Sequence, residues 1–192
     1  MILRRDGSAV VLRWSTPEAD QLIDLFDGVS GLLADADAAD GVDPARTRLL
    51  PDGHRDDPAA AAAFRELTEV SLIAAKRSAL ATCIGELAAA DPEAGADPEA
   101  DVDAPPADRL VRLDGAGLQR WLQALNDVRL ALGTRLESLG ADLAAGRPPA
   151  DLPRDDIAEA AEAMWMVYGW LTAAQDDLVE AAMSGSGGSG VE

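Results

Sequence analysis

An apolar stripe with helical spacing runs along residues 118–136, and it constrains the fold more than any other stretch. Its members are Leu118, Trp121, Leu122, Leu125, Val128, Leu132 and Leu136. Leu130 and Ala131 lie off this stripe, so the predicted helix is apolar on more than one side and should be surrounded by other helices. Arg129 falls near the middle of the stripe, with Asn126 at its edge. Because an unpaired buried charge costs several kcal/mol, we expect Arg129 to meet a carboxylate or a group of carbonyls.

The remaining chain carries the signals of four more helices. A capping residue precedes a proline at Ser15-Thr16-Pro17 and at Asp57-Pro58, which predicts a helix start at both places. Thr68-Glu69 either caps a third helix or bends the second, and the helical pattern then continues to about residue 89. A last helix is predicted over residues 155–183.

These patterns predict a mainly α fold, an orthogonal or irregular bundle of about five helices with a small N-terminal β-hairpin. The hairpin covers residues 2–14 and turns at Asp6-Gly7, and residues 109–113 form a short extended segment. We expect a single helical domain over residues 1–183. Residues 91–108 hold seven acidic and no basic residues, which is typical of a disordered acidic loop. The Gly/Ser-rich residues 184–192 are predicted to be a flexible tail.

The charge of the chain limits its partners. It carries 35 acidic and 16 basic residues, a formal net charge of −19. Such a field repels phosphate backbones, so nucleic-acid binding would need a strong local basic patch. No apolar run approaches the roughly 20 residues of a membrane span, and no secretory signal is recognisable. We therefore expect a cytoplasmic protein without a membrane segment.

Polar residues on apolar helix faces form the candidate site. Lys76 points into the apolar face of its helix, and Glu69 lies two turns earlier on the same side. With Arg129 they are predicted to form a buried polar cluster between two helices, near Asn126 and the Gln175 of the last helix. Two roles stay open. The cluster is either an ion-pair network that fixes helix register or an anion pocket in which Lys76 and Arg129 bind a carboxylate or phosphate.

Other residues with reactive or ligating side chains are few. His54 is the only histidine and is expected to lie exposed in a loop, whereas Cys83, the only cysteine, is expected in the core. The alternating acids of residues 97–103 lack the glycine that a calcium loop has at its sixth position. We therefore predict no catalytic residue, no metal site and no cofactor. Met166 and Trp170 form a second apolar side on the last helix, which favours a homodimer through that helix.

Three segments carry a resemblance to a known family. They are Arg48-Leu49-Leu50-Pro51-Asp52 with Asp56-Asp57-Pro58 and Phe64-Arg65-Glu66-Leu67-Thr68-Glu69; Leu125-Asn126-Asp127-Val128-Arg129-Leu130-Ala131-Leu132-Gly133-Thr134-Arg135-Leu136; and Tyr168-Gly169-Trp170-Leu171-Thr172. They resemble an uncharacterised actinobacterial family, a domain of unknown function commonly encoded beside the ClpS-type adaptor of the Clp protease. The resemblance implies a neighbourhood in regulated proteolysis, and some members carry a transcriptional-regulator label. It implies no catalytic residues.

The favoured interpretation is a non-enzymatic cytoplasmic protein that acts through protein–protein contacts, with a link to Clp proteolysis. One alternative is a transcriptional regulator that binds DNA. Its candidate basic residues are Arg4, Arg5, Arg13, Arg109, Arg112 and Arg120. The other alternative is a small-anion-binding sensor or enzyme that uses Lys76 and Arg129.

Overall fold

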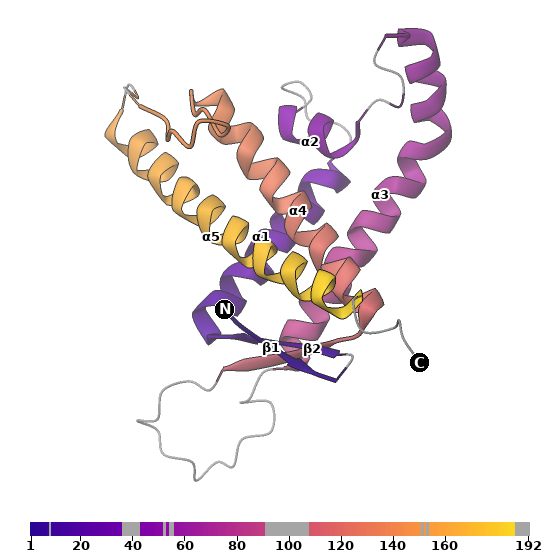
Figure 1. Cartoon of the computed structure of the whole chain (residues 1–192). Helices are drawn as coiled ribbons and strands as arrows, with labels where there is room; N and C mark the ends of the chain where they lie inside the picture. The colour runs from indigo at the N-terminus through magenta and orange to yellow at the C-terminus, as the bar shows by residue number, and fades with distance from the viewer. Residues whose placement is uncertain are drawn as a thin grey trace.

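The computed structural model describes residues 1–7, 9–35, 43–51, 53, 56–90, 108–150, 152 and 154–186. The described residues contain three strands and five helices (Figure 1). The elements are β1 (Ile2–Asp6), β2 (Ala9–Trp14), α1 (Thr16–Ala34), α2 (Pro44–Leu49), α3 (Pro58–Ala89), β3 (Arg109–Leu113), α4 (Gly115–Ser138) and α5 (Asp155–Ser186). The predicted mainly α fold of about five helices with a small N-terminal β-hairpin is therefore confirmed. The acidic loop predicted over residues 91–108 falls almost wholly outside the described residues, as do residues 187–192 of the predicted tail.

Two of the predicted elements differ from the structure. Of the two possibilities at Thr68, the start of a third helix is wrong, because α3 is one helix from Pro58 to Ala89. Periodicity also missed α2, a six-residue helix that begins after Asp43. The Asp43 carboxylate accepts a hydrogen bond from the Ala45 amide at 2.7 Å. The number of helices stays at five because one predicted break is absent and one short helix is added.

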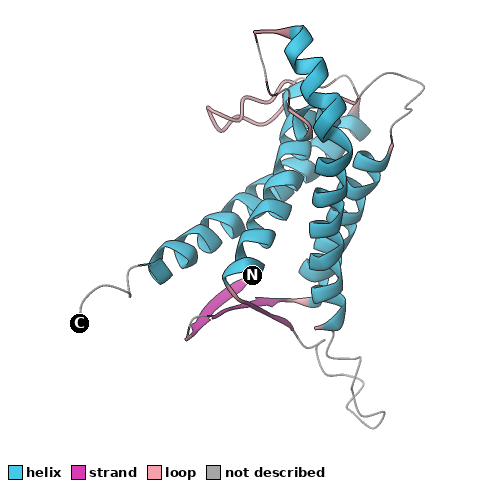
Figure 2. Ribbon diagram, turned by 90° about the vertical axis from the view of Figure 1, so that its right-hand side faces the viewer, coloured by secondary structure: helices cyan, strands magenta, loops and turns pink. Residues whose placement is uncertain are grey.

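The N-terminal hairpin is part of a three-stranded antiparallel sheet in the order β1-β2-β3. Gly7 supplies the positive φ of +64° that the turn between β1 and β2 requires. The segment predicted as extended, β3, pairs with β2 so that Val10 lies opposite Leu113 and Leu12 opposite Val111. These apolar side chains are buried on one face, and the sheet lies across one end of the helices (Figure 2). The hairpin thus gains the third strand and the packing that an isolated hairpin lacks.

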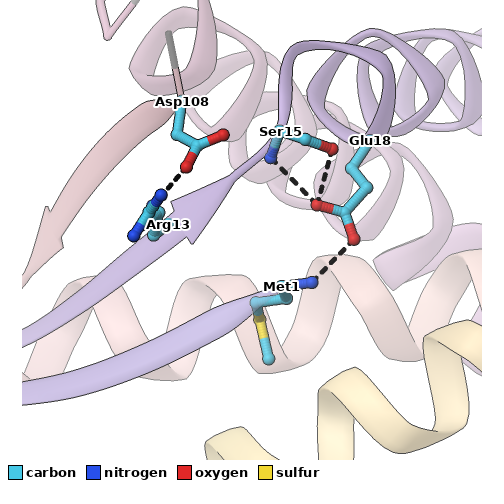
Figure 3. A network of polar contacts seen from close by, with 5 residues as sticks. All are labelled: Met1, Arg13, Ser15, Glu18 and Asp108. Carbon is cyan, nitrogen blue, oxygen red and sulfur yellow. Dashed lines mark hydrogen bonds and ion pairs between the residues drawn. The ribbon is translucent and has the colours of Figure 1, made fainter.

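A polar network attaches the hairpin to the start of α1 (Figure 3). Glu18 accepts hydrogen bonds of 2.9 Å from both the amide and the hydroxyl of Ser15, the residue that caps α1. Its other carboxylate oxygen lies 2.6 Å from the amino group of Met1 on the hairpin. Burial raises the pKa of Glu18, but the hydrogen bonds from Met1 and Ser15 outweigh it and leave the pKa below its usual value. Arg13 of β2 forms an ion pair with Asp108, which precedes β3.

Helix α4 is the centre of the molecule, as predicted, because it contacts α1, α2, α3, α5 and β3. Buried hydrophobic residues from β2, β3 and the five helices form one cluster. Its aromatic centre is Trp121 of α4, which stacks on Trp14 with ring centroids 5.9 Å apart and meets Phe26 edge-on at 5.9 Å. Trp170 of α5 meets Trp14 from another side at 5.8 Å. The aromatic rings thus join the sheet to α1, α4 and α5.

The first part of α3 extends away from the other helices, at the upper right of Figure 1. Among residues 58–70 only Ala61 is buried, whereas Leu67 is 83% exposed and Val70 is 81% exposed. The second part of α3 returns to the core with Leu80, Cys83 and Leu87. In the described ranges, no helix is both long enough and apolar enough to cross a lipid bilayer.

Candidate functional site

Lys76 of α3 forms an ion pair with Asp127 of α4, with Nζ 2.6 Å from Oδ1. The Asp127 side chain is only 6% exposed and that of Lys76 is 20% exposed. Burial raises the pKa of the Asp127 carboxyl. The hydrogen bond from Lys76 and its charge oppose this effect only in part, so the pKa stays above its usual value. The pair is therefore a buried contact between two helices, which matches the register-fixing role considered for Lys76.

Arg129 has a different environment. Its Nη1 donates a 2.6 Å hydrogen bond to Oε1 of Gln175 on α5. Its guanidinium lies over the ring of Tyr168, 5.4 Å from the centroid. Its Nε is buried and has no hydrogen-bond partner. Both of its partners are therefore neutral, and the expected carboxylate or group of carbonyls is not among them.

The predicted cluster of Glu69, Lys76 and Arg129 is thus divided into three separate contacts. Glu69 accepts a 3.0 Å hydrogen bond from Arg46 of α2, because the early part of α3 passes α2 rather than α4. Asn126 is exposed beside Arg129. Of the predicted set, the structure brings together Arg129 and Gln175 alone through a hydrogen bond among the described residues.

Asp127 is the residue that sequence reasoning missed. It lies with Ala124 and Ala131 on the second apolar side of α4, at spacings of three and four residues, and all three are buried. A carboxylate within an apolar row signals a buried cation partner. That row, rather than the stripe that holds Arg129, is the one that faces Lys76.

A pocket of about 160 Å³ lies beside Arg129. It is lined by Arg48, Asn126, Arg129, Leu130, Gly133, Thr134, Glu137, Leu143 and Tyr168. Gly133 allows the close approach that forms one wall, since a Cβ there would lie 3.0 Å from Leu143 and 3.4 Å from Tyr168. The pocket therefore combines two guanidinium groups with apolar and aromatic surface.

A larger pocket of about 300 Å³ lies where β3 leads into α4. Two arginines line it, and both are already paired. Arg112 forms an ion pair with Asp6, and Arg120 lies 3.0 Å from Glu86. Neither guanidinium is left without a carboxylate, so this pocket offers less to an anionic ligand than the one at Arg129.

Four of the six arginines proposed for DNA binding form ion pairs with carboxylates. Arg13 pairs with Asp108, Arg109 with Asp20 at 2.8 Å, Arg112 with Asp6, and Arg120 with Glu86. Arg109 is moreover only 6% exposed. Arg4 and Arg5 remain exposed on β1. Carboxylates therefore neutralise most of the positive charge on which that alternative depends.

The residues of the predicted dimer interface lie in different environments. Met166 is 65% exposed, but Trp170 is partly buried and packs against Trp14. Trp170 therefore belongs to the intramolecular aromatic cluster, and a homodimer through α5 would have Met166 as its exposed member. His54 lies outside the described residues.

Cys83 is fully buried on α3, as expected. Burial, with a smaller effect of the nearby Glu86 carboxylate, raises the pKa of the thiol to about 12. Thiolate is the reactive form of cysteine, so this thiol is held in its inert form. Among the described residues, no group of histidine, cysteine and acidic side chains could hold a metal ion.

We expect Cys83 to react with 5,5′-dithiobis(2-nitrobenzoate) only as the protein unfolds. A pKa of about 12 leaves only about 10⁻⁴ of the thiol ionised at pH 8, against about a quarter of an ordinary thiol. The absorbance of released thionitrobenzoate measures the reaction rate of Cys83 in the native protein and, with denaturant, in the unfolded protein. The rate in the native protein should be at least about 100-fold lower than the rate in the unfolded protein. Rates within tenfold of each other would show that the thiol is accessible and ionisable in the folded protein.

Comparison with known proteins gives relatives that bear a regulatory name. A family model described as "Domain of unknown function (DUF2017)" matches residues 1–182. A Mycobacterium leprae protein that carries the AosR name is 32% identical over 180 residues, covering 87% of this chain and 70% of that protein. Proteins of Mycobacterium bovis and Mycobacterium tuberculosis named "Oxidative stress regulator AosR" are each 31% identical over 206 residues, covering 91% of this chain and 83% of theirs. No solved structure matches the chain significantly.

Proposed function

The chain belongs to the DUF2017 family, and from this membership we propose that it is a regulatory protein that acts by binding another protein. The regulatory part of the proposal is supported by the relatives named oxidative stress regulators. The buried, inert Cys83 argues against a thiol switch within these 192 residues. We therefore propose that a partner protein carries the signal, and that the chain itself is not an enzyme.

The observation that supports a protein partner is the exposed apolar row on the extended part of α3. Ala63, Leu67, Val70 and Ala74 are spaced by four, three and four residues, and all four are exposed. This spacing places them on one face of the helix. Single exposed apolar side chains are common on protein surfaces, but a continuous row of them marks an interaction site. We call these four residues the α3 row.

The occupant that we propose for the α3 row is a basic amphipathic helix of a different protein. A row with this spacing packs naturally against the apolar face of another helix. The net charge of −19 repels a second copy of the chain and attracts a basic partner. A homodimer through α5 stays a prediction, and so does a link to Clp proteolysis in the cytoplasm. The capture experiment described below identifies the partner.

The same charge argues against direct binding to DNA. Arg13 and Arg112 of the sheet are paired with carboxylates and offer little charge to a phosphate backbone. The net charge of −19 would repel that backbone. A transcriptional effect of such a regulator would then pass through its protein partner.

We expect the double variant Leu67→Asp/Val70→Asp to lose partner binding by at least about tenfold, a change of about 1.4 kcal/mol. The 192-residue chain would capture partners from native cell extract. A peptide with the basic helix of the captured protein would then be titrated by fluorescence anisotropy. The variant should keep its circular dichroism spectrum, because both side chains are more than four-fifths exposed. Added salt should weaken the wild-type interaction.

The matched control is Met166→Asp/Met183→Asp, which changes two exposed apolar side chains of α5 instead. It should bind as the wild type does. Equal binding by the α3 variant, a captured segment without basic helical character, or a dimer in light scattering that the α3 variant abolishes would each contradict the proposed occupant.

A further inference from the structure

In the part of the chain that the structure describes, Arg129 is a half-buried cation whose contacts include no carboxylate. Lys76 pairs with Asp127, Arg46 with Glu69 and Arg120 with Glu86, all at 3.0 Å or less. Among the described residues, Arg129 meets the amide of Gln175 and the ring of Tyr168. In a chain with 35 acidic and 16 basic residues, carboxylates are in excess, so a guanidinium left with neutral partners is unexpected. Desolvating that charge without a counter-ion costs free energy that a bound anion would recover.

The hydrogen-bonding capacity of Arg129 is mostly unused. A guanidinium has five N–H donors, and the protein accepts from Nη1. Nε is buried without an acceptor. The nitrogens Nε of Arg46 and Arg120 are buried without an acceptor as well, but those two groups have a carboxylate on Nη2. Among the described residues, Nη2 of Arg129 has no such carboxylate, and Arg129 lines the pocket.

Arg48 brings a second positive charge to the same pocket. It extends from α2, lies exposed, and forms no ion pair within the described part of the chain. Two guanidinium groups from different helices can bind one carboxylate with several charge-assisted hydrogen bonds. Glu137 also lines the pocket, which leaves a net charge of one positive unit.

The size and lining of the pocket select the class of ligand. A volume of about 160 Å³ lies below the roughly 300–1,000 Å³ of pockets that bind drug-sized ligands, so the ligand is small. Leu130, Leu143 and Tyr168 offer apolar surface for a short hydrocarbon body. The carboxylate of Glu137 and the net charge of −19 disfavour a doubly charged phosphate relative to a singly charged carboxylate.

We propose that this pocket binds a small monocarboxylate, with Arg129 and Arg48 on its carboxylate and Leu130, Leu143 and Tyr168 around its hydrocarbon body. Lys76 takes no part, because Asp127 already neutralises it. The site is separate from the α3 row, so it neither requires nor excludes the proposed protein partner. Because its ligand would contact α2, α4 and α5 together, binding would stabilise the arrangement of these helices.

Butyrate is the probe, and the 192-residue chain is titrated with it by ¹H–¹⁵N NMR at constant ionic strength. We expect saturable shifts of the Asn126, Gly133 and Thr134 amides and of the Arg129 Nε–H, with a Kd of about 1 mM. Butyramide has the same shape without the charge and should cause no saturable shift. Inorganic phosphate should bind at least about fivefold more weakly than butyrate.

The variant Arg48→Gln should raise the Kd for butyrate at least about fivefold and leave the fold unchanged, because Arg48 is exposed and unpaired. Glu137→Gln, a neutralising change on the same pocket, should lower the Kd. No saturable shift with butyrate, equal binding of butyramide, tighter binding of phosphate, or an unchanged Kd in Arg48→Gln would each overturn the proposal.

Discussion

Replacing Lys76 with methionine is expected to lower the free energy of unfolding at pH 7 by about 3–5 kcal/mol. Methionine keeps much of the length and the apolar stem of lysine but removes the ammonium that lies 2.6 Å from Asp127. The Asp127 carboxylate, 6% exposed, then stays buried without a counter-ion. Urea unfolding followed by circular dichroism measures the loss, with the midpoint and the slope fitted separately.

The double variant Lys76→Met/Asp127→Leu tests whether the loss comes from the stranded charge. Both ions are then absent, and apolar side chains of similar size fill the space between α3 and α4. Such replacements of buried pairs are often neutral or stabilising, so the double variant should recover to within about 1 kcal/mol of the wild type. An equally unstable double variant would mean that the pair contributes through its shape or its hydrogen bond rather than through charge balance.

The pH dependence of Lys76→Met gives an independent expectation. Burial already raises the pKa of Asp127 in the wild type, and removal of the lysine removes the interaction that opposes this rise. When the pKa of a carboxyl is higher in the folded than in the unfolded state, its protonation stabilises the folded state. This stabilisation is lost as the pH rises through the pKa of the folded state. The deficit of the variant relative to the wild type should therefore shrink as the pH falls from 7 toward 5. A deficit that is constant over this range would contradict a buried carboxylate as its cause.

Local signals in the sequence predicted most helix starts because capping and periodicity act over a few residues. Asp57 accepts hydrogen bonds from the Ala59 and Ala60 amides, as expected before a proline at the first helical position. The same signal stands at Asp43-Pro44 and starts α2, but α2 has only six residues and therefore too few for a periodic pattern.

No new helix starts at Thr68, because a hydroxyl side chain inside a helix can also bond to the carbonyl one turn earlier. The Thr68 hydroxyl donates to the carbonyl of Phe64, one turn earlier, instead of capping a new helix. Ser71 donates to the Thr68 carbonyl in the same manner. Such back-bonding leaves the main-chain ladder intact, so a capping residue type in mid-helix is an ambiguous signal.

The candidate site could be predicted only in part because its contacts join distant segments. Periodicity identified Lys76 and Arg129 as charges on apolar faces, and both are indeed at least half-buried. It could not pair them, because Lys76 and Asp127 are 51 residues apart and Arg129 and Gln175 are 46 apart. Which charge meets which partner depends on how α3, α4 and α5 cross. Spacing along one helix contains no information about that crossing.

Trp121→Ala is expected to cost about 3–5 kcal/mol, because Trp121 is fully buried and its removal would leave a large cavity. The deletion removes the stacking on Trp14 and the edge-on contact with Phe26, which join the sheet to α1 and α4. It also removes the Nε1–H that donates a 2.6 Å hydrogen bond to Glu86. Urea unfolding and the near-ultraviolet circular dichroism of the aromatic cluster measure the outcome.

Two further variants separate the causes of that loss. Trp121→Phe keeps an aromatic ring but lacks the N–H donor, so it should cost less than Trp121→Ala, about 1–3 kcal/mol. Trp165→Ala makes the same truncation at a partly buried residue of α5 that stacks on Tyr168 at 6.3 Å, outside the central cluster. It should cost at most about 2 kcal/mol, because a partly exposed site leaves no closed cavity. If Trp165→Ala were as damaging as Trp121→Ala, the aromatic cluster around Trp121 would not be the centre that joins the sheet to the helices, and α5 would carry that role instead.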